Sequence, residues 1–321
     1  MTEVRHRTVA ANGINIHIAE QGSGPLVLLL HGFPELWYSW RHQLPALAAA
    51  GFHGVAPDVR GYGQTDAPYP IEAYSMREMT ADAVGVLDAI GVEQAVVVGH
   101  DWGAPMAWHC ALLYPERFPA VIALSVPFAP RSSAMPPTQA FKRIFGDNFF
   151  YILYFQEPGV AEAELEEDVR RSMLLSLSNL SGGARSSEAL TPRRRASTMF
   201  GDRMPPSSLP EWLSQEDLDC YVREFQRTGF RGGLNRYRNM DRDWAELAEL
   251  QGAKVQQPAL FIAGEQDPVL SFTRLESMTP YVPHLKTVLL PGCGHWTQQE
   301  RPSEVNREIV EFLHGLPIWS Q

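Results

Sequence analysis

The chain has 321 residues, of which 45% are hydrophobic and 20% charged, an ordinary globular composition that excludes wholesale disorder. The net charge of −10 arises from acidic residues spread along the chain, which argues against nucleic acids and anionic membranes as partners. Three cysteines without close spacing exclude a disulfide scaffold and a cysteine-rich zinc site, and they suit a reducing, cytoplasmic location. The longest apolar run, Phe149–Phe155, is far shorter than the about 20 residues of a membrane span, and no secretory signal is visible.

The N-terminal residues predict a β-hairpin. Residues 3–10 and 14–20 flank Asn12-Gly13, a two-residue turn signal. Short apolar runs of the kind that form buried strands follow at Leu26–Leu30, Gly54–Ala56, Ala95–Val98, Val121–Leu124, Ala259–Ala263 and Thr287–Leu290. Helical patterns separate them at about 37–50, 75–90, 103–114, 271–281 and 302–314. This alternation predicts a mostly parallel sheet with helices on both faces.

The alternation stops near Pro127 and resumes near Pro258. Within this insertion we expect helices over Ala161–Leu177, Gln215–Thr228 and Trp244–Leu250, and a loop over Asn179–Pro210. The loop contains Arg193–Arg195, the one basic cluster, which we interpret as solvated. A helical insertion of about 120 residues in a parallel-sheet domain is most simply a lid over the carboxyl ends of the strands, where such sheets bind ligands.

A strand-to-helix turn at residues 96–103 carries the first chemical signal. Gly99 and Gly103 bracket Asp101 in the small-x-nucleophile-x-small pattern of a nucleophile elbow. The sharp bend needs small neighbours, because larger side chains would collide there. A carboxylate is already ionised near neutral pH, so Asp101 can attack carbon without a base to deprotonate it.

Two later segments supply partners for this nucleophile. His295 lies on a glycine-flanked loop after the last strand run, and Asp267 follows the strand before it. The predicted role of Asp267 is to hold the imidazole tautomer and to stabilise the imidazolium. Glu265 is a nearby competitor, but it falls closer to the end of the strand. The order nucleophile, acid, histidine is that of α/β hydrolases.

The loop His31-Gly32-Phe33-Pro34-Glu35 resembles the oxyanion loop of that family. The resemblance implies two backbone N–H donors, one from Phe33 and one from Trp102, the residue after the nucleophile. The segment Asp58–Gly63 also resembles the family, and we expect it to shape the site.

Two motifs of the insertion resemble the lid of soluble epoxide hydrolases. They are Phe150–Gly159, with its Phe-Gln-Glu-Pro sequence, and Leu234–Met240. The family places one tyrosine four residues before the phenylalanine of the first motif and another before Arg-Asn-Met, which here are Tyr151 and Tyr237. Tyr154 is interpreted as packing. The resemblance is to the bacterial type, without the N-terminal phosphatase domain of some animal members.

The resemblance covers essentially the whole chain and implies the α/β-hydrolase fold. We therefore predict a mostly parallel eight-stranded sheet with helices on both faces and a helical lid after the sixth strand. The expected organisation is a core at 1–129 and 251–321, with a helical cap at 130–250.

The implied activity is conversion of epoxides to vicinal diols through an alkyl ester on Asp101, which water activated by His295 hydrolyses. Tyr151 and Tyr237 would hold the epoxide oxygen, and no cofactor or metal is expected. The substrate would be a small-molecule epoxide, contacted by Phe33, Pro34, Trp102 and Phe155. Both a monomer and a homodimer stay open.

Two alternatives are weighed against this interpretation. A haloalkane dehalogenase would use Trp102 as a halide donor, but Phe33 stands where an asparagine is common in that family. A non-catalytic receptor on the same fold is disfavoured, because the triad and both lid tyrosines are present. Cys293 lacks the elbow context of a nucleophile.

Overall fold

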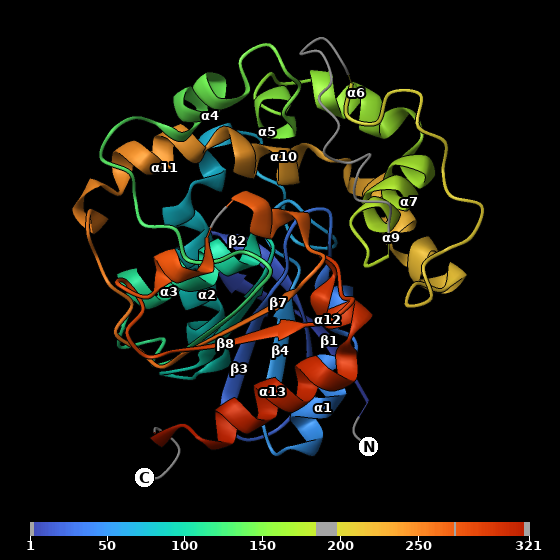
Figure 1. Ribbon diagram of the computed structural model, residues 1–321. Coiled ribbons are helices and arrows are strands. Elements are labelled where there is room, and N and C mark those ends of the chain that lie inside the picture. Colours follow the sequence, from blue (N-terminus) through green and yellow to red (C-terminus); the bar gives the residue numbers. More distant parts are fainter. Residues whose placement is uncertain (1–2, 184–197, 273, 318–321) are drawn as a thin grey trace.

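An eight-stranded sheet forms the centre of the computed structural model, which describes residues 3–183, 198–272 and 274–317 (Figure 1). Its spatial order is β1-β2-β4-β3-β5-β6-β7-β8. The first two strands pair antiparallel, β2 pairs antiparallel with β4, and all later neighbours pair parallel, as predicted. The strands are β1 (Arg5–Ala11), β2 (Ile14–Gly22), β3 (Leu26–Leu30), β4 (His53–Pro57), β5 (Val96–His100), β6 (Val121–Leu124), β7 (Ala259–Gly264) and β8 (Leu285–Leu290).

The predicted hairpin joins β1 to β2. Asn12 and Gly13 both have positive φ, 46° and 76°, as the favoured two-residue hairpin turn requires. The predicted apolar runs form the central strands of the sheet. Every residue of β3, β5 and β7 is buried, because both faces of the sheet are covered.

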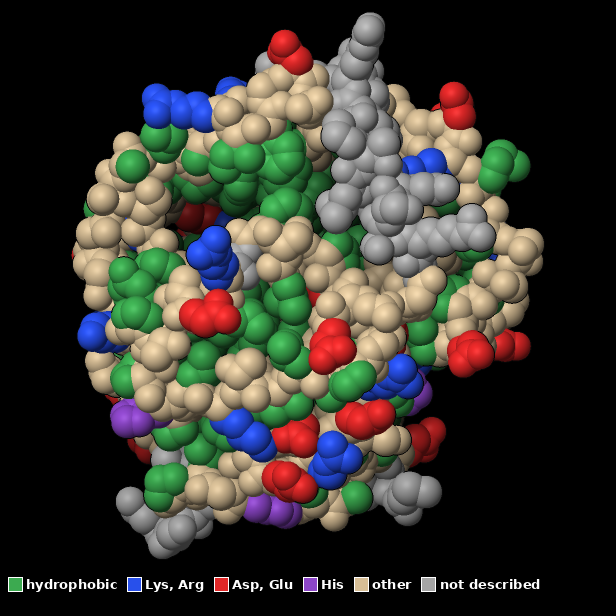
Figure 2. Space-filling view, viewed as in Figure 1, with side chains coloured by type: hydrophobic (Ala, Val, Ile, Leu, Met, Phe, Trp, Pro, Cys, Tyr) green, Lys and Arg blue, Asp and Glu red, His purple; other side chains and the backbone are tan. Residues whose placement is uncertain are grey.

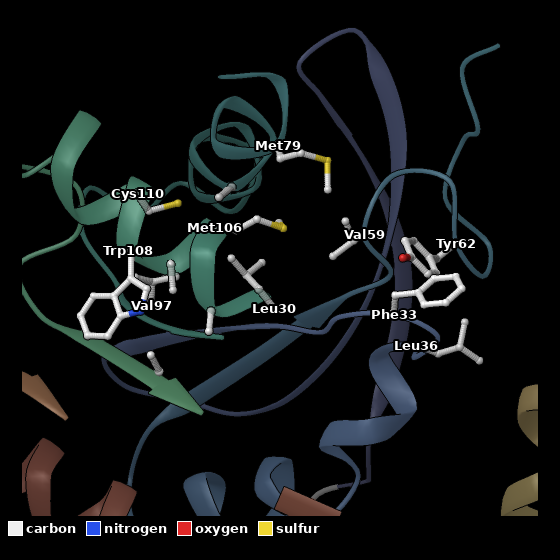
Figure 3. Packing of buried hydrophobic residues seen from close by; sticks show 14 of the residues in the cluster. Leu30, Phe33, Leu36, Val59, Tyr62, Met79, Val97, Met106, Trp108 and Cys110 are labelled. Carbon is white, nitrogen blue, oxygen red and sulfur yellow. The ribbon is translucent and has the colours of Figure 1, made fainter. Parts of the chain in front are cut away.

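Helices form a layer on each face of the sheet. Helices α1 (Gln43–Ala49) and α13 (Pro302–His314) pack together on one face, and α2 (Met76–Ile90) and α3 (Gly103–Leu113) cover the other (Figure 1). Figure 3 shows part of the second layer, where Met79, Met106 and Trp108 pack with Leu30 and Val97 of the strands. The predicted helix ends at glycines are confirmed, since Gly51 and Gly91 follow α1 and α2 with positive φ.

The chain between β6 and β7 builds a helical layer over one end of the sheet (Figure 1). This layer lies beyond the carboxyl ends of the parallel strands, as the lid prediction requires. Its helices are α4 (Pro137–Phe145), α5 (Tyr151–Tyr154), α6 (Val160–Glu167), α7 (Val169–Asn179), α9 (Gln215–Thr228), α10 (Arg231–Arg238), α11 (Met240–Glu246) and the 3₁₀ turn η3 (Ala248–Leu250).

Several predicted helices are wrong in their limits. The helix expected at 37–50 divides into a 3₁₀ turn, η1 (Trp37–Trp40), and α1, because Pro45 lacks an N–H and fits only the first turn of a helix. The helix expected at Ala161–Leu177 breaks at Asp168, which is extended and caps α7 by accepting a hydrogen bond from the Arg171 amide.

Two further segments also differ from prediction. The helix expected at 271–281 is replaced by the 3₁₀ turns η4 (Pro268–Phe272) and η5 (Leu275–Met278), and the backbone is extended at Arg274. The helix expected at Trp244–Leu250 is instead the end of α11 followed by η3. Helices α4, α5 and α10 were not predicted. Arg193–Arg195 lie outside the described residues, so the interpretation of that cluster stays a prediction.

The surface mixes charges of both signs. On the face shown in Figure 2, acidic and basic side chains alternate over the lower half of the molecule. Among the residues that the structure describes, no helix has the length and apolar character needed to cross a membrane.

Candidate active site

The predicted nucleophile elbow forms between β5 and α3. Asp101 follows the last residue of β5 and has a φ of 49°, a left-handed conformation that costs energy for a residue with a side chain. A Cβ on Gly99 would lie 1.9 Å from the carbonyl oxygen of Gly103, and one on Gly103 would lie 2.0 Å from that of Leu30. The glycines are therefore required by close backbone contacts, and the bend lifts Asp101 out of the sheet edge.

The loop after β3 brings a backbone donor to this carboxylate. The N–H of Phe33 donates a 2.7 Å hydrogen bond to Oδ1 of Asp101. A Cβ on Gly32 would lie 2.3 Å from the same oxygen, so only glycine permits the approach. His31 fixes the loop, because its Nδ1 donates to the Gly32 carbonyl and its Nε2 accepts from the Val59 amide. The segment Asp58–Gly63 thus helps to shape the site.

The other oxygen of Asp101 faces His295. Nε2 of His295 lies 3.5 Å from Oδ2 of Asp101, and Nδ1 lies 3.2 Å from both carboxylate oxygens of Asp267. Asp267 is 3% exposed and His295 is 2% exposed, whereas Glu265 is exposed to solvent. The geometry therefore places Asp267, and not Glu265, beside the imidazole.

Charges within the site determine its protonation. Burial alone would lower the pKa of His295, but the Asp267 carboxylate and the hydrogen bonds to Asp101 and Asp267 raise it well above its usual value. Burial would raise the pKa of Asp267, but the charge of His295 and hydrogen bonds from His295, Ser125 and the Val269 amide lower it. Both shifts favour a protonated imidazole beside an ionised Asp267 carboxylate.

Two cap helices carry the predicted tyrosines. Tyr151 begins α5 and Tyr237 lies near the end of α10, and their ring centroids are 6.0 Å apart. The Gln156 side chain joins the two helices, because its Nε2 donates to the carbonyls of Ile152 and Tyr237. Arg238 adds a second link by donating to the Phe155 carbonyl. The Phe-Gln-Glu-Pro sequence thus holds both tyrosines in one unit.

Both phenols stay protonated at neutral pH. Burial raises the pKa of Tyr151, and the charges of Asp101 and Asp267 raise it further. Burial and the Asp101 charge also raise the pKa of Tyr237, against the weaker effect of a side-chain hydrogen bond with Trp102. The dependence of both values on Asp101 reflects the position of the phenols near the nucleophile.

Aromatic rings connect the helical insertion between β6 and β7 to the sheet domain around Asp101. The ring of Tyr237 lies 5.6 Å from that of Phe33, 5.0 Å from Phe155 and 5.0 Å from Trp102, centroid to centroid. Pro34, joined to Phe33 by a cis peptide bond, is buried. Its part in substrate binding, and the role of the Trp102 amide as a second oxyanion donor, stay predictions.

Tyr154 points to a different partner. Its hydroxyl donates a 2.7 Å hydrogen bond to Glu164, whose carboxylate also accepts from the amides of Met199 and Phe200. Cys293 is buried, with its sulfur 3.6 Å from the carbonyl oxygen of Gly294. Burial raises the pKa of this thiol, which disfavours the thiolate that a nucleophile needs.

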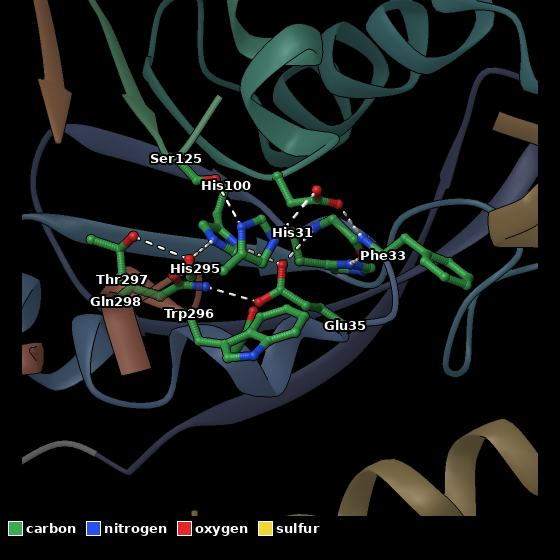
Figure 4. Close-up of polar contacts among 12 residues, drawn as sticks. His31, Phe33, Glu35, His100, Ser125, His295, Trp296, Thr297 and Gln298 are labelled. Carbon is green, nitrogen blue, oxygen red and sulfur yellow. Dashed lines mark hydrogen bonds and ion pairs between the residues drawn. The ribbon is translucent and has the colours of Figure 1, made fainter. Parts of the chain in front are cut away.

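Sequence reasoning missed a buried polar network beneath the triad. Nδ1 of His100 lies 2.7 Å from Glu35, and its Nε2 lies 2.8 Å from the carbonyl oxygen of His295 (Figure 4). Glu35 also accepts hydrogen bonds from the Gly32 amide and the Gln298 side chain. Ser125 was missed as well; its hydroxyl oxygen lies 3.0 Å from Nδ1 of His295. A glutamate in the loop His31–Glu35 could have indicated a buried polar network, because a buried charge needs polar partners. No feature of the sequence indicated a contact between Ser125 and His295.

A cavity of about 1300 Å³ lies elsewhere, where the cap meets the loop around Tyr69–Glu72. Its lining includes Glu162, Glu166, Arg231 and Arg238, and does not include Asp101, His295, Tyr151 or Tyr237. Among the described residues, no group of three or more His, Cys, Asp or Glu side chains is arranged to hold a metal ion.

Comparison with known proteins agrees with this geometry. Residues 25–302 match the family described as the alpha/beta hydrolase fold. The chain is 52% identical to epoxide hydrolase A of Mycobacterium tuberculosis over 97% of its own length and 98% of the relative's. It is 43% identical to bifunctional epoxide hydrolase 2 of Sus scrofa, of which it spans 53%.

Solved structures give the same result. The crystal structure of epoxide hydrolase A from Mycobacterium thermoresistibile superposes with a TM-score of 0.94 at 51% identity, covering 98% of this chain and 99% of that one. An epoxide hydrolase from an endophytic Streptomyces also has a TM-score of 0.94, at 50% identity, with 98% and 96% of the two chains covered. The chain belongs to the epoxide hydrolases of the α/β-hydrolase fold.

Proposed function

We propose that the protein converts epoxides to vicinal diols in two steps, with Asp101 as the nucleophile. The observation that carries the proposal is the way the Asp101 carboxylate is held. One oxygen accepts from the Phe33 amide and the other faces His295. The partly buried Tyr151 and the buried Tyr237 lie close together in the same aromatic cluster as Phe33. A carboxylate presented in this way can attack carbon with one oxygen while the other stays in a donor site.

In the first step, Oδ2 of Asp101 attacks a ring carbon and the C–O bond of the epoxide breaks. Tyr151 and Tyr237 donate hydrogen bonds to the epoxide oxygen, and one of them supplies its proton. Their raised pKa values support this role, because a phenol must be protonated to donate. The product of the step is a glycol monoester of Asp101.

After ring opening, the tyrosinate recovers a proton from the His295 imidazolium, which leaves a neutral imidazole. In the second step, His295 removes a proton from water, and the water oxygen attacks the carbonyl carbon of the ester. The Cγ–Oδ2 bond of Asp101 then breaks, the departing diol oxygen takes the proton from His295, and the proton of the new Asp101 carboxyl returns to His295. The Phe33 amide already binds the oxygen that becomes the oxyanion, and Trp102 is the proposed second donor. Esterification removes the Asp101 charge, one cause of the raised pKa of His295. The imidazole therefore becomes easier to deprotonate once the ester has formed, when a base is needed.

Halide chemistry is less well supported. A dehalogenase needs N–H donors free to bind the leaving halide. The Trp102 ring instead packs edge-to-face with the Tyr237 phenol, with ring centroids 5.0 Å apart, and its side chain is one cause that lowers the pKa of that phenol. Phenols suit an alkoxide, which is a strong base, far better than a halide ion.

We also propose that residues 130–250 act as a cap on a core formed by 1–129 and 251–321. Arg236 supports this division, since it donates to the Tyr74 carbonyl of the core and lies over the Trp102 ring at 4.8 Å.

The substrate class is small-molecule epoxides. A cytoplasmic location is proposed because Cys110, Cys220 and Cys293 are all free thiols.

The proposal is tested by assaying the purified protein on aryl, terminal, trans-disubstituted and fatty-acid epoxides, with 1-halobutanes in parallel. We expect diol from at least one epoxide class and no comparable halide release. Faster release of halide than formation of diol would contradict the proposal. The Asp101→Asn variant serves as the control, because its amide cannot attack carbon.

A further inference from the structure

Ser125 lies at the end of β6 in a strained turn. Its φ is 71°, and the Val126 amide donates to the Leu124 carbonyl across it at 2.8 Å. This pattern is a γ-turn with positive φ, the rarer and more strained of the two γ-turn forms. The Ser125 amide donates to the Ile262 carbonyl of β7, and the residue is fully buried. A buried non-glycine residue in such a conformation points to a constraint beyond packing.

The turn directs the hydroxyl at the histidine–aspartate pair. Ser125 Oγ lies 3.0 Å from Nδ1 of His295 (Figure 4). Each carboxylate oxygen of Asp267 lies slightly farther from the same nitrogen, at 3.2 Å. The Ser125 side chain is also one of the groups that lower the pKa of the Asp267 carboxyl. A hydroxyl in this place can accept the N–H of His295 with a lone pair while its own proton is directed at the Asp267 carboxylate. Ser125 follows β6, whereas Asp267 follows β7. The imidazole of His295 is therefore contacted by residues at the ends of two neighbouring strands.

The contacts of Asp267 indicate why the Ser125 hydroxyl helps to orient the His295 ring. Its two oxygens lie at the same distance from Nδ1, an arrangement that does not by itself select one orientation of the ring. The Val269 amide donates to Oδ1 and fixes one side of the carboxylate. The serine hydroxyl supplies a further bond to this fully buried pair, where each hydrogen bond to a charge counts strongly.

We propose that Ser125 is a positioning residue for the second half-reaction. It holds Asp267 and His295 in the orientation that lets Nε2 deprotonate water. The inference rests on the proposed function and deepens it by adding a positioning residue to the triad of Asp101, Asp267 and His295. The first half-reaction does not need His295 as a base, so loss of the hydroxyl should slow ester hydrolysis far more than alkylation.

The test compares substitutions at position 125 by rapid mixing with styrene oxide, with Trp fluorescence reporting alkylation and quenched-flow mass spectrometry reporting the ester. We expect Ser125→Ala to slow hydrolysis of the alkyl-enzyme about tenfold, the effect of losing one hydrogen bond to a charged group. Alkylation should change less than about twofold, so the ester accumulates.

Three further variants separate the hydroxyl from the backbone. Ser125→Gly relieves the positive φ but removes the hydroxyl, so it should match Ser125→Ala if the hydroxyl matters. Ser125→Asn tolerates positive φ and carries an N–H donor for Asp267, so it should restore part of the rate. Ser39→Ala removes another buried hydroxyl, one that donates to the Leu36 carbonyl, and should leave both steps unchanged.

Wild-type hydrolysis rates in both Ser125→Ala and Ser125→Gly would overturn the inference. So would an equal loss in alkylation and hydrolysis, which would indicate a general distortion of the site. Failure of the wild-type protein to form diol from any epoxide would instead contradict the proposed function, and so the two failures are distinguishable.

Discussion

The amide nitrogen of Phe33 lies 2.7 Å from Oδ1 of Asp101 in the resting protein. In the proposed mechanism, this donor is already in contact with the oxygen that would become the ester carbonyl and then the oxyanion. The proposed mechanism needs no movement of the loop between its two steps, because the same oxygen would stay bound to the Phe33 amide. Preorganised donors of this kind stabilise the charge of a transition state more than donors that must reorient during the reaction.

Replacement of the base should separate the two half-reactions. We expect His295→Gln to be alkylated by styrene oxide but not to release diol, since only the second step requires a base. Intact mass spectrometry should show a gain of one epoxide mass. His284→Gln, which changes an exposed histidine, should turn over normally. If His295→Gln carries no adduct at saturating epoxide, the two-step scheme does not hold.

Removal of the phenols should block ring opening. Tyr151→Phe with Tyr237→Phe leaves both rings in the aromatic cluster but removes both donors, so alkylation should nearly cease. Either substitution alone should cost about 10²-fold, the scale of positioned acid catalysis. Tyr154→Phe is the matched control, because its hydroxyl binds Glu164, and it should alkylate at the wild-type rate. An unimpaired double variant would exclude the phenols from the reaction.

The pKa of His295 should depend on the charge of Asp101. In the free protein the carboxylates of Asp267 and Asp101 hold it well above its usual value. In Asp101→Asn, as in the ester, the Asp101 charge is absent, so the pKa should fall and the neutral base should be present at lower pH. Titration of ¹⁵N-labelled histidine by NMR measures this change. An identical pKa in wild type and Asp101→Asn would refute the proposed coupling.

The nucleophile elbow should not tolerate a side chain at Gly99 or Gly103. In Gly99→Ala the new Cβ would meet the Gly103 carbonyl oxygen at 1.9 Å, so part of the backbone must shift. We expect a loss of at least about 1–3 kcal/mol in the free energy of unfolding, the usual cost of overpacking. Gly315→Ala has no contact closer than 3.4 Å and should change stability little. Urea denaturation compares the two, and equal stabilities would show that the elbow can relax.

Much of this arrangement follows from the sequence for physical reasons. Buried strands such as β3 and β5 are predictable because their apolar runs are continuous, and Asp101, Asp267 and His295 follow strands whose carboxyl ends share one edge of the sheet. The cap is harder to predict. Helix α9 coincides with the predicted Gln215–Thr228, but the unpredicted α4, α5 and α10 have 9, 4 and 8 residues. Such short helices depend on tertiary hydrogen bonds, such as that of Gln156 to the Tyr237 carbonyl. Ser125 could not be found, since its role depends on a positive φ that no local pattern announces.

The origin of the new oxygen in the diol distinguishes attack by Asp101 from direct attack by water. If Asp101 attacks carbon, the first turnover transfers a carboxylate oxygen to the product. A single turnover in oxygen-18 water, with protein in excess over epoxide, should therefore give mostly unlabelled diol and leave the label in the peptide that contains Asp101. Fully labelled diol from that first turnover, with no label in the peptide, would mean that water attacks the epoxide directly and would contradict the account.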